Sequence, residues 1–301
     1  MGHSEFQGVI TPLLTPYEDD HAIATDLYLD HAARCLGDGS HYISPFGTTG
    51  EALSNSSAER MKLLDLLVSS GTAQPGQIMP GTGLCALEDT LTLTRHAVGL
   101  GCAAVMVLPP FFYVNAGDEG LYRYFSQLIE RLGAFDPKIC LYHIPQMAGI
   151  GISPELAKRL NDAFPQNVVA YKDSSGDWNN TKAVIEAAPG LSVFPASETS
   201  LVSGLKAGGA GCISATCNTN IAEIRRLFEF ASSGNSQGAA AMEPAIRQHR
   251  VAVQEAGLIP ALKSMVAAAS GDRRWLNLRP PLENADEAVG QRLCRALSPG
   301  I

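Results

Sequence analysis

The 301-residue chain has few charged residues and no long apolar run. Asp, Glu, Lys and Arg make up 17% of its residues, a smaller share than in a typical soluble domain. No segment approaches the roughly 20 apolar residues that a membrane-spanning helix needs. No positively charged start precedes an apolar stretch, as it would in a signal peptide. We therefore expect a cytoplasmic protein that does not act in a membrane.

Clusters of positive charge are also missing. The formal net charge is −8, and no run of Lys and Arg departs from that balance. Nucleic acids and anionic membrane surfaces bind basic patches, so both are poor partners for this chain. A local site can still bind an acidic small molecule.

Paired cysteines are absent as well. The seven cysteines are scattered from Cys35 to Cys294 without a C-x-x-C pair. An odd, dispersed set is typical of reduced thiols and not of a disulfide framework. Neither the cysteines nor the histidines have metal-ligand spacing. The sequence thus predicts no metal centre.

No Pro-, Gly- or Ser-rich linker divides the chain, and one pattern recurs along it instead. A short apolar run, often β-branched, ends in polar or glycine residues, and a helical stretch follows. Ser56 and Glu59 form a capping box before one such helix, and Ser153 precedes Pro154 at the start of another. The runs expected to be strands are residues 8–14, 41–46, 77–83, 103–109, 138–144, 168–172, 191–195 and 211–216.

This repeated unit predicts an α/β fold with a parallel sheet covered by helices. Eight units within about 220 residues favour a (β/α)₈ TIM barrel over a doubly wound sheet. A Rossmann-like sheet would need a dinucleotide fingerprint after its first strand, and Gly8-Val9-Ile10-Thr11-Pro12 is not one. We expect a barrel over residues 1–220 and a helical extension over 221–301 that packs on it as one functional unit, with helices at 239–253 and 258–269.

In such a barrel, catalytic residues lie at the carboxyl ends of the strands. Lys172 ends the sixth expected strand, where an unmatched charge is costly to bury. A neutral lysine amine attacks a ketone, and the resulting iminium accepts electrons when a neighbouring carbon–carbon bond breaks. The competing interpretation is a lysine that extends its amine into solvent. Position alone does not separate the two.

Two further features follow expected strands. Tyr142 ends the fifth, and its phenol can donate and accept a proton, although an isolated tyrosine is more often packed in a core. The loop Gly47-Thr48-Thr49-Gly50-Glu51 follows the second, and its N–H and hydroxyl groups can bind a carboxylate. Alone the loop would be a plain turn, and it becomes informative beside the lysine and the tyrosine. His143 lies near the same site, where a lone histidine is more often structural or substrate-contacting than a base.

Five motifs together resemble the dihydrodipicolinate synthase/N-acetylneuraminate lyase family of pyruvate aldolases. They span nearly the whole chain in the family's order and spacing, and together they are highly specific. They are Gly47-Thr48-Thr49-Gly50-Glu51, Tyr142-His143-Ile144-Pro145, Tyr171-Lys172-Asp173-Ser174-Ser175-Gly176-Asp177, Gly208-Gly209-Ala210-Gly211-Cys212-Ile213-Ser214 and Leu278-Arg279-Pro280-Pro281-Leu282.

The resemblance implies a (β/α)₈ barrel with C-terminal helices, usually a homotetramer built as a dimer of dimers. It implies pyruvate chemistry without a metal or other cofactor. Lys172 would form a Schiff base with the substrate, Tyr142 would relay protons, and Thr48 would connect that relay. Thr48 and Thr49 would hold the pyruvate carboxylate, and the carbonyl of Ile213 would face the pyruvate. The further substrate contacts that we expect are Gly47, His143, Met147, Ser174, Ser197 and Glu198.

Departures from the family pattern concern the second substrate. Members that make dihydrodipicolinate carry an arginine after Y-N-V-P-S, which binds the carboxylate of aspartate semialdehyde, and Met147 takes its place here. A methionine cannot form that bidentate pair. Ser197 and Glu198 stand where lyases of the family contact substrate hydroxyls, and Ser174 is similarly placed. We therefore expect a second-substrate pocket that binds hydroxyls more than a carboxylate.

The resemblance leaves one position open. Synthases of the family supply a tyrosine across the dimer interface from a P-Y-Y-N stretch, and this chain has Pro110-Phe111-Phe112-Tyr113. An ungapped match puts Phe112 at the relay position, whereas a shift of one residue puts Tyr113 there.

The leading hypothesis is a Schiff-base-forming, aldolase-type C–C lyase. It would act on a 2-oxo-3-deoxy acid and give pyruvate, or another 2-oxo acid, and an aldehyde. The specific alternative is 4-hydroxy-tetrahydrodipicolinate synthase, which joins pyruvate to aspartate semialdehyde in lysine biosynthesis. A dehydratase or deaminase could use the same iminium. A barrel that binds 2-oxo acids without catalysis is disfavoured because Lys172, Tyr142 and Thr48 are all present, and a metal-dependent aldolase because no ligand cluster is evident.

Overall fold

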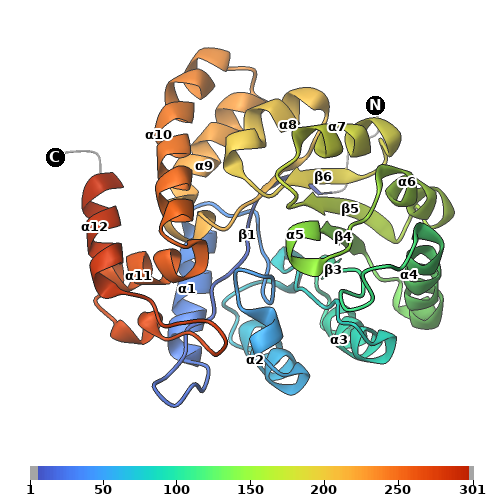
Figure 1. The fold of residues 1–301 in the computed structure, drawn as a ribbon, viewed down its shortest axis with the longest axis horizontal. Helices are drawn as coiled ribbons and strands as arrows, with labels where there is room; N and C mark the ends of the chain where they lie inside the picture. Colours follow the sequence, from blue (N-terminus) through green and yellow to red (C-terminus); the bar gives the residue numbers. More distant parts are fainter. Residues whose placement is uncertain (1–5, 298–301) are drawn as a thin grey trace.

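The computed structural model describes residues 6–297, which form a ring of helices around parallel strands (Figure 1). The side chains of nearly every strand residue are buried, as expected when helices cover a parallel sheet. The predicted α/β barrel with a helical C-terminal part is confirmed. The strands are β1 (Gly8–Thr11), β2 (Tyr42–Ile43), β3 (Val105–Val107), β4 (Ile139–His143), β5 (Val168–Asp173), β6 (Ser192–Pro195) and β7 (Gly211–Ile213).

Two sheets make up most of the barrel wall, in the orders β2-β1-β7 and β3-β4-β5-β6. All of their strand pairs are parallel. The sheets meet on one side where the backbone N–H of Ala210, just before β7, donates to the carbonyl of Val193 in β6 over 2.9 Å. The wall is therefore continuous between β6 and β7.

The other junction contains the one expected strand that is not regular. Residues 77–83 were expected as a strand, but only single parallel bridges form there, from Ile78 to Ile43 and from Gly81 to Met106. The physical reason is composition: Pro80 has no N–H to donate, and two glycines follow it closely. Gly81 is required because a Cβ there would lie 2.1 Å from the carbonyl oxygen of Phe46. The segment still joins β2 to β3, and it closes the barrel.

The outer ring of helices begins where the sequence indicates. The capping box of Ser56 and Glu59 starts α2, and the hydroxyl of Ser153 accepts from the N–H of Leu156 at the start of α6. The helices of this ring are α1 (Thr25–Gly37), α2 (Ser57–Ser69), α3 (Leu87–Gly99), α4 (Asp118–Leu132), α6 (Pro154–Ala163), α7 (Trp178–Ala187), α8 (Leu201–Ala207) and α9 (Cys217–Ser232). The short α5 (Pro145–Ala148) lies inside the ring, over the strands (Figure 1).

The C-terminal helices lie together on one side of the barrel, coloured orange to red in Figure 1. They are α10 (Ser236–Glu255), α11 (Leu258–Ser270) and α12 (Glu287–Leu297), which confirms the helices expected at 239–253 and 258–269. Leu14 and Ala215 of the barrel share a hydrophobic core with Leu262 and Trp275 of the extension. The two parts therefore bury apolar surface against each other.

The expected boundary at residue 221 falls inside α9, whose backbone leaves helical geometry at Asn220. The division into 1–220 and 221–301 stays a prediction, and residues 1–5 and 298–301 lie outside the described range. Within residues 6–297, no single helix is long and apolar enough to cross a membrane. The pair α10 and α11, bent by 110°, passes that test by length and composition.

Candidate active site

A cavity of about 260 Å³ opens at the carboxyl ends of the strands. Side chains from the ends of several different strands meet in it, together with residues of α10 and α11. The expected site residues that line it are Thr48, Thr49, Tyr142, Met147, Lys172, Ser174, Ser197 and Ile213.

Lys172 lies in the wall of this cavity and is only 3% exposed. Its Nζ lies 4.2 Å from the centre of the Tyr142 ring, because the parallel register of β4 and β5 pairs these two residues. No carboxylate of residues 6–297 forms an ion pair with this amine. The interpretation of Lys172 as a lysine that extends into solvent is therefore wrong, because its side chain is buried and lines this cavity.

The carboxylate next in the chain is occupied elsewhere. One oxygen of Asp173 accepts from the hydroxyl of Ser175 over 2.6 Å, and the other accepts from Asn180 and Thr181, each over 2.8 Å. These contacts hold Asp173 at the start of the loop that leads to α7. They leave the neighbouring amine available for chemistry.

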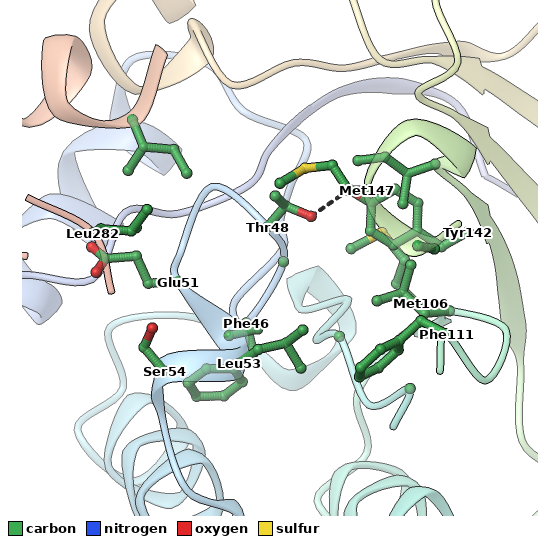
Figure 2. Close-up of a pocket in the computed structure, with 18 of the residues that line it drawn as sticks. Phe46, Thr48, Glu51, Leu53, Ser54, Met106, Phe111, Tyr142, Met147 and Leu282 are labelled. Carbon is green, nitrogen blue, oxygen red and sulfur yellow. Dashed lines mark hydrogen bonds between the residues drawn. The ribbon is translucent and has the colours of Figure 1, made fainter. Parts of the chain in front are cut away.

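Tyr142 connects Lys172 to the loop that follows β2. Its hydroxyl lies 2.9 Å from Oγ1 of Thr48, within hydrogen-bond distance (Figure 2), and its side chain is almost fully buried. The structure thus brings an amine, a phenol and a hydroxyl close together. Such a set of groups can pass a proton to or from an atom bound near the amine.

The loop that carries Thr48 and Thr49 is tightly folded. The N–H of Gly50 donates to the carbonyl of Gly47, and the N–H of Glu51 donates to that of Thr48, each over 3.1 Å. A Cβ at Gly50 would lie 2.5 Å from the carbonyl oxygen of Leu13, so the glycine is needed there. Glu51 adopts left-handed backbone geometry with φ 52°, a strained conformation that surrounding contacts must hold in place.

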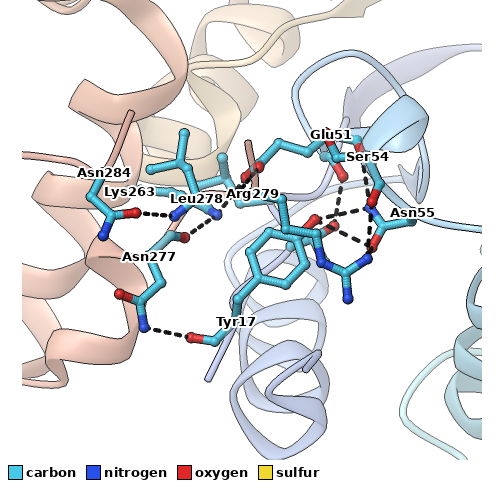
Figure 3. Close-up of polar contacts among 12 residues, drawn as sticks. Tyr17, Glu51, Ser54, Asn55, Lys263, Asn277, Leu278, Arg279 and Asn284 are labelled. Atoms are coloured by element: carbon cyan, nitrogen blue, oxygen red, sulfur yellow. Dashed lines mark hydrogen bonds and ion pairs between the residues drawn. The ribbon is translucent and has the colours of Figure 1, made fainter. Parts of the chain in front are cut away.

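Those contacts come from the C-terminal extension (Figure 3). The carboxylate of Glu51 pairs with Lys263 of α11, and neither side chain has any exposed surface. The backbone N–H of Arg279 donates to the second oxygen of Glu51 over 3.1 Å, and Lys263 also donates to the carbonyl of Asn277 over 2.7 Å. Burial lowers the pKa of Lys263 to about 8, while the charge of Glu51 opposes that shift.

Arg279 adds a second connection between the extension and the same region. Its guanidinium lies 4.7 Å from the centre of the Tyr17 ring and donates to Glu59 over 2.6 Å. This hydrogen bond is the largest reason why the pKa of Glu59 falls to about 2. The segment that resembles the family's C-terminal motif therefore serves to hold the second-strand loop and the start of α2.

Among the expected site residues that do not line this cavity, His143 and Glu198 are buried and bonded elsewhere. His143 follows Tyr142 in β4, so its side chain points to the opposite face. Its Nδ1 accepts from the N–H of Ile152 over 2.9 Å, and burial lowers its pKa. Glu198 is buried and accepts from the hydroxyls of Ser214 and Thr216. The expectation that both would contact substrate is not supported by their positions.

A second, more apolar cavity of about 270 Å³ shares Thr48, Tyr142 and Met147 with the first (Figure 2). Gly47, an expected substrate contact, lines this second cavity instead of the first. Phe112 and Tyr113 line neither cavity. They project from the loop after β3 with 76% and 72% of their surface exposed, and their rings meet edge to face at 5.5 Å.

Sequence reasoning missed the residues that the extension contributes. Arg250 and Gln254 of α10 and Leu258 of α11 line the first cavity. No local pattern distinguishes them from other polar or apolar helix residues, because only the packing of α10 over the barrel brings them there. Within residues 6–297, no group of three or more His, Cys, Asp or Glu side chains is placed to hold a metal ion.

The buried pair of Glu51 and Lys263 leads to a test of stability. Lys263→Met should lower the free energy of unfolding by about 3–5 kcal/mol, because it leaves a buried carboxylate without its partner. The double variant Lys263→Met/Glu51→Gln should recover much of that loss. Urea unfolding followed by circular dichroism measures both. Lys158→Met, in an exposed pair with Asp162, is the control and should cost less than about 1 kcal/mol. A single variant as stable as the wild type would contradict this account.

Known proteins resemble this chain along nearly its full length. An uncharacterized DapA-like lyase of Chloroflexus aurantiacus is 34% identical over 283 residues, which cover 93% of this chain and 92% of that protein. The 4-hydroxy-tetrahydrodipicolinate synthase of Thermus thermophilus is 32% identical over 296 residues, covering 96% and 95%. The crystal structure of dihydrodipicolinate synthase from Agrobacterium tumefaciens superposes with a TM-score of 0.88 at 29% identity, covering 97% and 99%.

These findings confirm the predicted family, the barrel fold and the lyase class of the enzyme. The pattern of the dihydrodipicolinate synthetase family matches residues 5–299, so the match includes the strand ends, the second-strand loop and the C-terminal helices alike. With that match and these relatives, the chain belongs to the dihydrodipicolinate synthetase family.

Proposed function

We propose that this lyase forms a Schiff base between Lys172 and a 2-oxo acid, and that it cleaves or makes a 2-oxo-3-deoxy acid. The products of cleavage would be pyruvate and an aldehyde. The observation that carries the proposal is a buried amine without an ion-pair partner, which lies over the ring of Tyr142 in a cavity at the strand ends. No metal or other cofactor enters the proposed chemistry.

The reaction begins when the neutral amine attacks C2 of the substrate. The carbinolamine loses water and becomes an iminium, which withdraws electrons from C3. A base then takes the proton of the C4 hydroxyl, the C3–C4 bond breaks, and its electron pair moves into the iminium to give an enamine. The aldehyde leaves, C3 of the enamine takes up a proton, and water hydrolyses the iminium to release pyruvate and restore the amine.

Tyr142 is proposed as the group that moves protons in these steps. Its phenol lies beside the amine and is hydrogen-bonded to Thr48, so it can both donate and accept without leaving its place. Thr48 and Thr49 would hold the carboxylate of the 2-oxo acid, and the carbonyl of Ile213 would face it. Gly47 shapes the same loop.

The part of the cavity around β5 and β6 would hold the rest of the substrate. Ser174 and Ser197 line it there, and their hydroxyls suit the hydroxyl groups of a 2-oxo-3-deoxy acid. Met147 contributes no charge. His143 and Glu198 act, in this proposal, from behind the cavity wall and not on the substrate.

The proposed covalent step predicts a change in mass. Wild-type protein treated with pyruvate and borohydride should gain one reduced pyruvate adduct, located by peptide mapping at Lys172. Lys172→Ala should gain none and should lose turnover, whereas Lys182→Ala, at an exposed lysine on α7, should behave as wild type. Tyr142→Phe should lower kcat about 10²–10⁴-fold. A wild-type protein that gains no mass would instead support a barrel that binds 2-oxo acids without catalysis.

A second candidate function is 4-hydroxy-tetrahydrodipicolinate synthase. It is favoured by the relative of that name in Thermus thermophilus. It is disfavoured by Met147, which lies at the position of the family's carboxylate-binding arginine and is 66% exposed. Because the same iminium serves both reactions, the two candidates differ only in the second substrate.

A panel of substrates separates these candidates. Pyruvate release from 2-oxo-3-deoxy sugar acids and sialate should be followed with lactate dehydrogenase, and pyruvate consumption with aspartate semialdehyde as the acceptor. Without the family arginine, we expect kcat/KM for aspartate semialdehyde to be at least about tenfold lower than for the best cleaved acid. Efficient condensation with aspartate semialdehyde, with every sugar acid inert, would make the synthase the correct function.

We also propose a homotetramer built as a dimer of dimers. Three exposed apolar residues, Leu53, Met147 and Leu282, line the second cavity. Three more, Phe112, Tyr113 and Val114, directly follow Phe111, which also lines it. In a dimer, Phe112 or Tyr113 of one protomer would enter the second cavity of its partner, beside the Thr48–Tyr142 pair.

A cytoplasmic location is proposed as well, because the seven cysteines are free thiols that suit a reducing compartment.

The two aromatic residues can be told apart by single substitutions. If the hydroxyl of Tyr113 joins the proton relay, Tyr113→Phe should lower kcat at least about tenfold while sedimentation shows an unchanged oligomer. Phe112→Leu should then leave kcat within about threefold of wild type. A fully active protein that sediments as a monomer at assay concentration would contradict both the assembly and the shared relay.

A further inference from the structure

Arg250 brings a second positive charge to the catalytic cavity. It lies on α10, lines the same cavity as Lys172, and has 16% of its side chain exposed. Lys172 and Arg250 are the only lysine and arginine among the residues that line this cavity. The proposed reaction uses the amine of Lys172 and leaves the guanidinium of Arg250 without a role.

Hydrogen bonds to neighbouring side chains hold the guanidinium in place. Its Nε donates to the side-chain oxygen of Gln254 over 3.1 Å, and Nη1 donates to the hydroxyl of Ser214 over 3.3 Å. The buried carboxylate of Glu198 lies 3.9 Å from Nη1, too far for a hydrogen bond, and already accepts from Ser214 and Thr216. Glu198 therefore balances the charge without occupying the guanidinium.

Two nitrogen donors remain unused beside the cavity. No group of residues 6–297 accepts from Nη2 of Arg250 or from the side-chain nitrogen of Gln254. Both residues line the cavity, and the hydrogen bond between them keeps the two side chains adjacent. A charged donor next to a neutral donor matches the two oxygens of one carboxylate.

The position of Arg250 indicates which end of the substrate it meets. Its Nη1 lies 3.9 Å from the carboxylate of Glu198, which directly follows Ser197 in the chain. The guanidinium therefore approaches the part of the cavity that Ser197 lines. In the proposed function, that part of the cavity holds the carbon chain beyond the reacting carbonyl.

We propose that Arg250, assisted by Gln254, binds a carboxylate on the aldehyde portion of the substrate, and that the preferred substrate is therefore a dicarboxylic 2-oxo acid. The inference rests on the proposed function and names the substrate class for it. Arg250 is a specificity-determining residue in this account, and it takes no part in bond breaking.

A matched pair of substrates tests the proposal. 4-Hydroxy-2-oxoglutarate and 4-hydroxy-2-oxopentanoate give pyruvate with glyoxylate or acetaldehyde, and they differ only in a carboxylate against a methyl group. Wild-type kcat/KM should favour the dicarboxylic acid at least about tenfold. Arg250→Met should remove that preference mainly through KM, with kcat/KM for the methyl substrate within about threefold of wild type.

Two further variants distinguish the loss of the carboxylate contact from an effect on folding. Arg250→Met leaves the buried Glu198 without a nearby positive charge, so Arg250→Met/Glu198→Gln removes both charges and should show the same loss of preference. Arg247→Met changes an exposed arginine one turn earlier on α10, and it should retain the wild-type preference. A preference that survives in both Arg250 variants would overturn the proposal.

Binding without covalent chemistry separates this inference from the proposed function. Calorimetric titration of Lys172→Ala should show tighter binding of the dicarboxylic acid than of the methyl acid, and the difference should vanish in Lys172→Ala/Arg250→Met. Equal affinity for both acids in Lys172→Ala would overturn the role of Arg250, even if borohydride traps pyruvate on the wild type. Tighter binding of 2-oxo-3-deoxy-6-phosphogluconate than of the dicarboxylic acid would also overturn it, because the anion would then be a phosphate.

Discussion

The buried ion pair between Glu51 and Lys263 joins the two parts of the chain on which the site depends. Glu51 ends the loop that carries Thr48, and its left-handed backbone would not persist without contacts that hold it. Lys263 belongs to α11, so the strained loop and the C-terminal helices are fixed to each other in a fully buried place. The hydroxyl of Thr48 can then remain at hydrogen-bond distance from Tyr142. A charge pair far along the sequence from Lys172 thus sets the geometry beside it.

The barrel and the C-terminal extension contribute different residues to the cavity. The strand ends provide the reacting groups, because parallel pairing places Tyr142 directly beside Lys172. Helix α10 provides Arg250 and Gln254 to the same cavity. This division lets the chemistry of the 2-oxo group stay constant while the residues of α10 and of the loops choose the rest of the substrate. It agrees with the general use of barrel folds, in which loops and additions vary the chemistry of one scaffold.

Burial decides the role of each polar group near the cavity. Lys172 is buried without a carboxylate partner, which suits a nucleophile, whereas Lys263 is buried with one, which suits a structural support. Glu198 resembles a substrate contact by its place in the sequence, yet its oxygens are already bonded to Ser214 and Thr216. The same residue types therefore serve catalysis or structure according to the partners that the fold gives them.

The sequence by itself determined the fold class, the family, the C-terminal helices and the set of strand-end residues, because strand–helix periodicity and the order of motifs are local properties of the chain. It did not reveal the irregular strand around Pro80, the outward direction of His143, the bonded state of Glu198 or the presence of Arg250 in the cavity. Each of these depends on which side chains meet across segments far apart in the chain, as when Arg250 of α10 meets Ser214 after β7. Only tertiary packing determines such long-range contacts, since the local sequence around a side chain does not identify the residue that will pack against it.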